Sequence, residues 1–239
     1  MHGAAGTVGS GHRVPNYRAL SAGQPGKIHV LTLDYRRLGH SSGTPTENGI
    51  ILDALAVAEW AVNTAGIPSS RVLIFGQSLG TTVSIAISNQ FAQQTPPVVF
   101  AGTVLVAPFV AVATLVSTYC VAGAIPISSP LAQFPLLFRS LQRFISDKGL
   151  SKDHIAQYVR TNEGHGEKYR LTVIHAEDDY DVPWSHTTEI FWHAVNATLP
   201  TGISFDELEE NKSESKTDLG AAGSVMEWRT ETGPSARRF

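Results

Sequence analysis

Short continuous apolar runs alternate along this chain with longer segments in which apolar residues recur at helical spacing. The apolar runs predict buried strands at residues 28–34, 71–75, 99–107 and 170–175. The periodic segments predict helices at residues 45–65, 79–93 and 184–198. Because strands that alternate with helices are typical of βαβ units, we expect an α/β fold with a mostly parallel sheet and helices on both faces.

The first predicted helix has recognisable signals at both ends. Thr44-Pro45-Thr46-Glu47 matches a capping box with proline at the first helical position, which predicts the start of the helix. Gly66 and Pro68 predict its end, because neither residue favours continuation of a helix.

A long segment without charge follows. Residues 72–138 contain no Asp, Glu, Lys, Arg or His. Its most apolar part is interrupted by Gly102, Pro108, Gly123 and Pro126, which argues against a transmembrane helix of about 20 residues. We instead predict a buried strand followed by an apolar lid or cap at about 109–165. The apolar cluster in this lid consists of Leu131, Phe134, Leu136, Leu137, Phe138 and Leu141.

The composition limits the architecture and the partners. The 239 residues suit one α/β domain, which we expect at 1–199. Residues 200–239 are polar, above all from Asp206 to Asp218, and predict a flexible C-terminal segment. A net charge of −3 without a basic stripe argues against nucleic acid as a partner. No cofactor motif, metal motif or signal peptide is recognisable, and the single Cys120 excludes an internal disulfide.

The pentapeptide Gly76-Gln77-Ser78-Leu79-Gly80 lies between a predicted strand and a predicted helix. A G-x-S-x-G nucleophile elbow requires this context, because its tight turn strains the serine backbone and raises the hydroxyl above the sheet. The two outer glycines let the strand and the helix pass closely, since they carry no Cβ. The pattern predicts Ser78 as a nucleophile, which also needs an acid, a base and an oxyanion hole.

Four carboxylates follow the predicted strand that ends at His175: Glu177, Asp178, Asp179 and Asp181. In enzymes with such an elbow the chain order is serine, acid, histidine, so an acid on this loop suits the order. Spacing alone leaves Asp179 as one choice among four, and a carboxylate on an exposed loop is more often simply solvated.

His2-Gly3 is the candidate oxyanion loop. One donor of the hole is the backbone N–H after the nucleophile, here that of Leu79. The other comes from a loop with an HG-type motif, which indicates the N–H of Ala4. Backbone donors of this kind stabilise the oxyanion that develops in acyl transfer. A His-Gly pair alone is a weak signal, because glycine-rich loops are common.

These motifs together resemble the α/β-hydrolase superfamily, and within it the monoacylglycerol and lysophospholipid lipase branch. The resemblance covers about residues 1–198 and is carried by the segments 2–6, 34–41, 43–47, 76–80, 175–179 and 182–183. It implies that Ser78 is the nucleophile and Asp179 the acid, because the family's aspartate falls four residues after the histidine and three before Val-Pro. It also implies a mono-acylated lipid ester as substrate and a membrane-associated location such as the endoplasmic reticulum.

The chain departs from the family pattern in three ways. It starts inside the oxyanion loop, so we expect an incomplete sheet. Arg37 stands where the family has glycine, which is unfavourable if that position needs a positive φ. No Gly-x-His follows the acid; His186 and His193 are weak candidates for the base, because a helix that follows the acid loop points away from the expected place.

The missing base predicts very low activity for this chain, which we interpret as truncated at both ends. A serine without a base stays protonated, and loss of a triad member costs turnover by a factor on the order of 10⁶. The alternatives are therefore a serine ester hydrolase acting through Ser78, and an inactive product or lipid-binding protein of the same fold. A third alternative is the same fold acting on a peptide or thioester. The lid either contacts an acyl chain or a membrane surface, or forms an ordinary helical cap.

Overall fold

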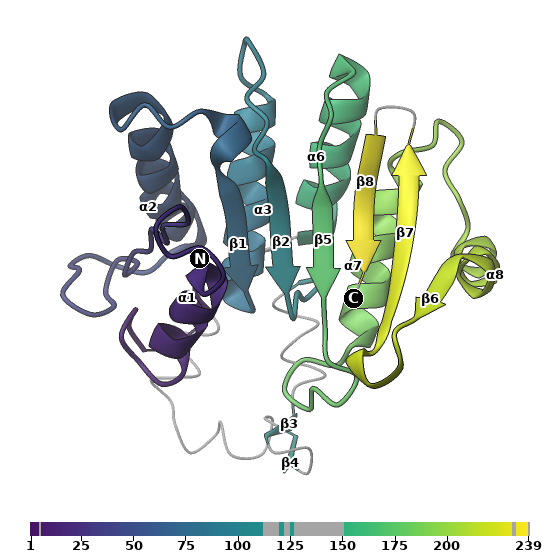
Figure 1. Cartoon of the computed structure of the whole chain (residues 1–239), viewed down its shortest axis with the longest axis horizontal. Helices are drawn as coiled ribbons and strands as arrows, with labels where there is room; N and C mark the ends of the chain where they lie inside the picture. Colours follow the sequence, from purple (N-terminus) through teal and green to yellow (C-terminus); the bar gives the residue numbers. More distant parts are fainter. Residues whose placement is uncertain (5, 112–119, 122–124, 127–150, 231–232, 239) are drawn as a thin grey trace.

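The computed structural model describes residues 1–4, 6–111, 120–121, 125–126, 151–230 and 233–238. Its centre is a six-stranded sheet in the order β1-β2-β5-β8-β7-β6 (Figure 1). The first four strands of that order run parallel, and β7 and β6 are antiparallel to their neighbours. The strands are β1 (Leu73–Gln77), β2 (Gly102–Val106), β5 (Leu171–Ile174), β6 (Lys216–Asp218), β7 (Ser224–Thr230) and β8 (Gly233–Arg238). A separate two-stranded sheet pairs β3 (Cys120–Val121) with β4 (Ile125–Pro126).

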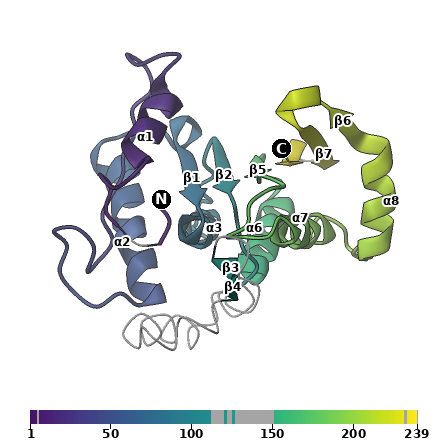
Figure 2. The same cartoon turned by 90° about the horizontal axis from the view of Figure 1, so that it is seen from below.

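The described helices cover the two faces of the main sheet unequally. They are α1 (Arg13–Ser21), α2 (Glu47–Glu59), α3 (Leu79–Ala92), α6 (Ser151–His165), α7 (Ser185–Asn196) and α8 (Phe205–Ser215). Figure 2 shows α3, α6 and α7 in a layer along one face, with α1 on the opposite side of the sheet in that view. The largest core lies under that layer and contains Ile85, Leu105, Ile155, Leu171, Val173 and Ile190. The predicted α/β fold with parallel central strands is confirmed.

The start of α2 differs from the predicted capping box. Thr46, and not Thr44, is the N-cap, and its side chain accepts a hydrogen bond from the backbone N–H of Gly49 at 3.1 Å. Glu47 is therefore the first helical residue and not the third. The helix continues into a π-helical turn (Trp60–Thr64), and Gly66 follows with a φ of 66°, as its predicted role at the helix end requires.

The strand predicted at residues 28–34 does not form. Ile28, Val30 and Leu31 are exposed. The reason is the absence of a partner for pairing within the described sheet: β1 is its edge strand, and Met1 lies along that edge, with its carbonyl accepting from the N–H of Gln77 at 3.1 Å. An apolar run becomes a strand only where its backbone groups find a neighbour.

The C-terminal region, predicted as a flexible segment at 200–239, contains regular structure. Ser204 and Glu207 form a complete capping box at the start of α8. Leu208 on that helix is fully buried against Phe191 and Met226. The strands β7 and β8 extend the main sheet, with β8 beside β5. A polar helix needs only one buried apolar residue to dock, and composition alone does not identify that residue. The domain boundary near residue 199 stays a prediction.

The predicted lid is only partly described. Residues 112–119, 122–124 and 127–150, including the apolar cluster from Leu131 to Leu141, lie outside the described residues. The end of the predicted lid forms α6, which packs against α3 and α7 in the main core through residues such as Ile155 and Val159. In the described ranges, no helix combines the length and the apolar character needed to cross a membrane.

Candidate active site

Ser78 occupies a sharp turn between β1 and α3. Its φ of 51° and ψ of −120° lie in a region that favours glycine, so the turn stores backbone strain of about 1–3 kcal/mol. The turn is fixed from both sides. The N–H of Ser78 donates to the carbonyl of Val106 at 2.9 Å, and the N–H of Thr81 donates to the carbonyl of Ser78 at 2.8 Å. The chain therefore holds this one side chain at the carboxyl end of β1 at an energetic cost.

The two glycines of the pentapeptide are required by close packing. A Cβ on Gly76 would overlap the carbonyl oxygen of Gly80 and the hydroxyl of Ser84. A Cβ on Gly80 would overlap the carbonyl oxygen of Met1. The predicted reason, a close approach of strand and helix, holds for Gly76, whereas Gly80 makes room for the N-terminal segment at Met1.

The candidate oxyanion loop lies beside Ser78. A Cβ built on Gly3 would be 3.3 Å from the Cβ of Ser78 and 3.8 Å from its Oγ. His2 is buried, its Nδ1 donates to the carbonyl of Gly3 at 2.8 Å, and its ring lies 4.6 Å from that of Tyr35. Burial lowers the pKa of His2, so the ring is neutral at pH 7. Leu79 is the first residue of α3, where a backbone N–H has no acceptor within the helix.

The acid loop distinguishes Asp179 from its three competitors. Glu177, Asp178 and Asp181 are exposed, whereas the side chain of Asp179 is 24% exposed. The Oδ1 of Asp179 accepts from the N–H of Asp181 at 3.0 Å and from the N–H of Val182 at 2.9 Å. Of the four carboxylates, Asp179 is thus the one that its loop holds in a partly buried position.

Ser78 and Asp179 lie at the same edge of the sheet. Ser78 follows β1 and Asp179 follows β5, with β2 between these two strands (Figure 1). Because the three strands are parallel, their carboxyl ends meet at one edge, where α/β proteins bind ligands. Two strand spacings separate β1 from β5, which is about 10 Å.

Several known proteins are similar to this chain in sequence. The chain is 30% identical over 223 residues to the lysophosphatidylserine lipase ABHD12 of Gallus gallus, an alignment of 92% of this chain and 51% of that protein. It is 32% identical over 201 residues to protein ABHD12B of Homo sapiens, covering 82% of this chain and 49% of that protein. The chain spans about half the length of the curated relatives that it matches. No family model matches it.

Solved structures give the same fold. The esterase of Pyrococcus furiosus superposes with a TM-score of 0.59 at 18% identity, covering 82% of this chain and 66% of that one. An α/β hydrolase of Vibrio vulnificus superposes with a TM-score of 0.59 at 17% identity, covering 90% of this chain and 70% of that one. The chain is an α/β-hydrolase domain protein. The predicted superfamily and fold are thereby confirmed.

The two candidate bases of this α/β-hydrolase domain are engaged elsewhere. His186 is 3% exposed, and its Nδ1 accepts from the N–H of Val110 at 3.4 Å. The Nε2 of His193 lies 3.7 Å from the Oε1 of Glu189 on the same helix. Burial lowers the pKa of both histidines. Within the described part of the chain, no histidine is hydrogen-bonded to Ser78, so the structure does not assemble a complete triad there.

His175 is a site residue that the sequence analysis named only as part of a motif. Its side chain is 2% exposed, its Nε2 donates to the carbonyl of Val182 at 2.7 Å, and its Nδ1 is paired with the hydroxyl of Thr187. The same Nε2 lies 3.5 Å from the Oδ2 of Asp179. The hydrolase domain thus uses His175 to connect β5, the acid loop and α7. Its position directly after a strand and four residues before Asp179 was the available signal.

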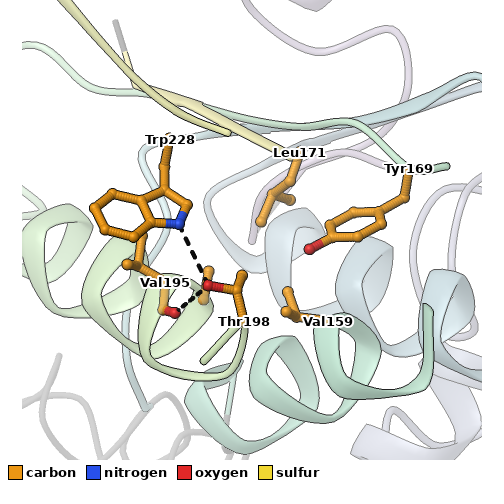
Figure 3. A pocket seen from close by; sticks show the side chains of 7 residues that line it. Val159, Tyr169, Leu171, Val195, Thr198 and Trp228 are labelled. Carbon is orange, nitrogen blue, oxygen red and sulfur yellow. Dashed lines mark hydrogen bonds between the residues drawn. The ribbon is translucent and has the colours of Figure 1, made fainter. Parts of the chain in front are cut away.

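An apolar crevice near the other end of β5 is unrelated to this site. It has an empty volume of about 160 Å³ without room for a water molecule, and lies between α6, α7 and the sheet (Figure 3). Trp228 closes it, with its Nε1 donating to the Oγ1 of Thr198 at 3.3 Å. The other lining residues are Val159, Tyr169, Leu171, Ala194 and Val195. We interpret it as a packing seam, because a substrate would find neither space nor the Ser78 hydroxyl there.

Among the residues that the structure describes, no group of three or more His, Cys, Asp or Glu side chains is arranged to hold a metal ion.

Proposed function

We propose that this domain hydrolyses carboxylic esters through an acyl-enzyme at Ser78. The observation that carries the proposal is the strained turn that presents Ser78 at the carboxyl edge of the sheet, with Gly3 packed against it. A backbone conformation that costs energy persists where the surrounding structure holds it in place, and such strain is concentrated at active sites. The similarity to relatives named as lysophosphatidylserine lipases supports the same class of reaction.

Each group has a role in the proposed reaction. The Oγ of Ser78 attacks the ester carbonyl, its proton passes to a base, and the carbonyl oxygen becomes an oxyanion. The N–H groups of Ala4 and Leu79 stabilise that oxyanion. The alcohol then leaves with a proton, and water hydrolyses the acyl-Ser78 ester. Asp179 is the acid that orients the base and stabilises its protonated form.

The substrate that we propose is an acylglycerol or a lysophospholipid with a single acyl chain. The named activity of the relatives supports a lysophospholipid. The uncharged segment at 72–138 supports an apolar ligand, and we propose that its part beyond residue 109 contacts the acyl chain or a membrane surface. A membrane-associated location follows from the same proposal. Cosedimentation with phosphatidylcholine vesicles tests the membrane contact, which is wrong if the protein stays in the supernatant.

A second candidate function is binding of the same lipids without cleavage. It is favoured by one observation: His175, His186 and His193 all have partners other than Ser78. Without a base the Ser78 hydroxyl keeps its proton, and turnover falls by a factor on the order of 10⁶. The two candidates therefore share a substrate class and differ in whether Ser78 reacts.

A fluorophosphonate probe separates the two functions. We expect slow labelling that mass spectrometry locates on Ser78 and that is lost in Ser78→Ala. Ser70→Ala, which removes an exposed serine outside the site, is the matched control and should label like the parent chain. Labelling of Ser78 would support the hydrolase. Absence of labelling after prolonged incubation, combined with retention of a fluorescent lysophospholipid, would support the binding protein. A panel of 1-acyl and 2-acyl glycerols, lysophosphatidylserine, a thioester and a peptide then defines the bond that is cleaved.

A further inference from the structure

One guanidinium group holds most of the candidate oxyanion loop. The Nη2 of Arg13 donates to the carbonyl of Gly3 at 3.1 Å and to the carbonyl of Ala4 at 3.3 Å. Its Nη1 donates to the carbonyl of Thr7 at 2.6 Å. Three carbonyl groups from a stretch of five residues therefore converge on a single side chain that follows them in the sequence.

These contacts fix the direction of the neighbouring N–H groups. A peptide unit is planar and trans, so its C=O and its N–H point in opposite directions. Because the carbonyl of Gly3 points to Arg13, the N–H of Ala4, which belongs to the same peptide unit, points away from Arg13. Gly3 also packs against Ser78, with a built Cβ only 3.3 Å from the serine Cβ.

We propose that Arg13 is the positioning residue of the oxyanion loop, and that its guanidinium directs the N–H of Ala4 towards the substrate oxygen at Ser78. This assignment rests on the proposed function. Arg13 does not touch the reacting atoms; it acts through the peptide units of Gly3 and Ala4. The residue type matters, because the planar fork of arginine supplies several donors in fixed directions and an ammonium group does not.

The helix that carries Arg13 does not explain these contacts. Arg13 is the first residue of α1, where the positive end of the helix dipole disfavours a cation. The helix buries no side chain and has no side-chain N-cap. A neutral residue would therefore serve the helix equally well, whereas the arginine donates hydrogen bonds to three carbonyl groups of the loop.

Two other contacts support the loop without replacing Arg13. His2 donates to the carbonyl of Gly3, and the carboxylate of Asp34 accepts from the N–H of Val8 at 2.7 Å. Among the residues that the structure describes, Arg13 alone donates a side-chain hydrogen bond to the carbonyl of Ala4. Removal of the guanidinium should thus loosen the peptide units at Gly3 and Ala4 while the two ends of the loop stay attached.

The test compares Arg13→Ala and Arg13→Lys with Arg18→Ala, which removes an exposed arginine from the same helix. Hydrogen exchange is measured for the amides of residues 2–8, with those of α3 as the internal reference. We expect at least tenfold faster exchange in the loop of Arg13→Ala, an intermediate effect for Arg13→Lys, and no change for Arg18→Ala. Unchanged loop exchange in Arg13→Ala would overturn the proposal.

A kinetic measurement tests the catalytic part of the assignment. The limiting rate of fluorophosphonate labelling should fall by about 10- to 100-fold in Arg13→Ala, because misplaced donors stabilise the transition state less. The probe concentration that gives half of the limiting rate should not change. A purely structural role would instead lower the fraction of protein that reacts. If Arg13→Ala does not melt cooperatively, Arg13→Lys provides the comparison. If the parent chain does not label at all, the proposed ester hydrolysis fails, whereas loop exchange still decides the role of Arg13.

Discussion

The Nε2 of His175 lies 3.5 Å from the Oδ2 of Asp179, and this buried histidine ties the candidate acid to the end of β5. The same ring nitrogen donates to the carbonyl of Val182, and the other ring nitrogen is paired with Thr187. The conformation of the acid loop therefore depends on a residue that precedes it, not only on the hydrogen bonds within the loop.

The first prediction concerns the stability that this network provides. His175→Ala leaves the carbonyl of Val182 and the hydroxyl of Thr187 without their partner. Because an unsatisfied buried polar group costs about 1–3 kcal/mol, we expect the free energy of unfolding to fall by about 2–4 kcal/mol. Urea unfolding measures the change. The control His29→Ala removes an exposed histidine and should stay within about 0.5 kcal/mol of the parent chain. Equal values for the two variants would contradict the prediction.

The second prediction follows from the backbone of Arg37. Its φ is 68°, so the concern raised by an arginine in place of the family's glycine is justified. A left-handed backbone costs a residue with a Cβ about 1–2 kcal/mol. Replacement by glycine removes this cost but gives the unfolded chain more conformational freedom, which cancels part of the gain. We expect Arg37→Gly to stabilise the protein by about 0.5–1 kcal/mol in urea unfolding. Arg37→Ala keeps the Cβ and should not stabilise; a gain in both variants would point to the lost charge instead.

Local patterns predicted the Ser78 turn because its sequence signals are contiguous along the chain. The turn needs glycines at fixed offsets, a strand before it and a helix after it, and each is visible in the sequence. The strand expected at residues 28–34 failed for the opposite reason, since pairing depends on a neighbour elsewhere in the chain. The choice among four carboxylates was likewise undetermined by spacing. The partial burial of Asp179 and its contact with the ring of His175 distinguish it, and these come only from the folded structure.

The third prediction tests the docking of the C-terminal region. Leu208 is the buried apolar residue of α8 and contacts a small core with Phe191, Val195 and Met226. Leu208→Ala should cost about 2–4 kcal/mol, because truncation of a fully buried leucine leaves a cavity. Leu219→Ala is the control, since Leu219 is 46% exposed, and should cost little. A negligible effect of Leu208→Ala would contradict this docking and support the expectation of a flexible segment.

The fourth prediction concerns the dependence of stability on pH. Burial lowers the pKa of His186. The charge of Glu189 raises this pKa and that of His175 lowers it, but burial is the largest effect. Its Nδ1 accepts from the N–H of Val110, so protonation would both break that hydrogen bond and bury a charge. The unfolded chain takes up a proton near pH 6.5, whereas the folded protein does not until the pH is lower. The stability is therefore complete above pH 6.5 and is lost as the pH falls below it.

His186→Asn tests this prediction. The shorter side chain supplies a neutral acceptor for Val110 and cannot titrate. We expect the slope of unfolding free energy against pH, measured by urea unfolding between pH 7.5 and 5.5, to decrease by up to about 1.4 kcal/mol per pH unit. His2 and His193 contribute in the same direction, so the variant should keep part of the slope. His40→Asn, at an exposed position, is the control and should keep all of it. Identical slopes in His186→Asn and the parent chain would mean that His186 is protonated as readily in the folded protein as in the unfolded chain.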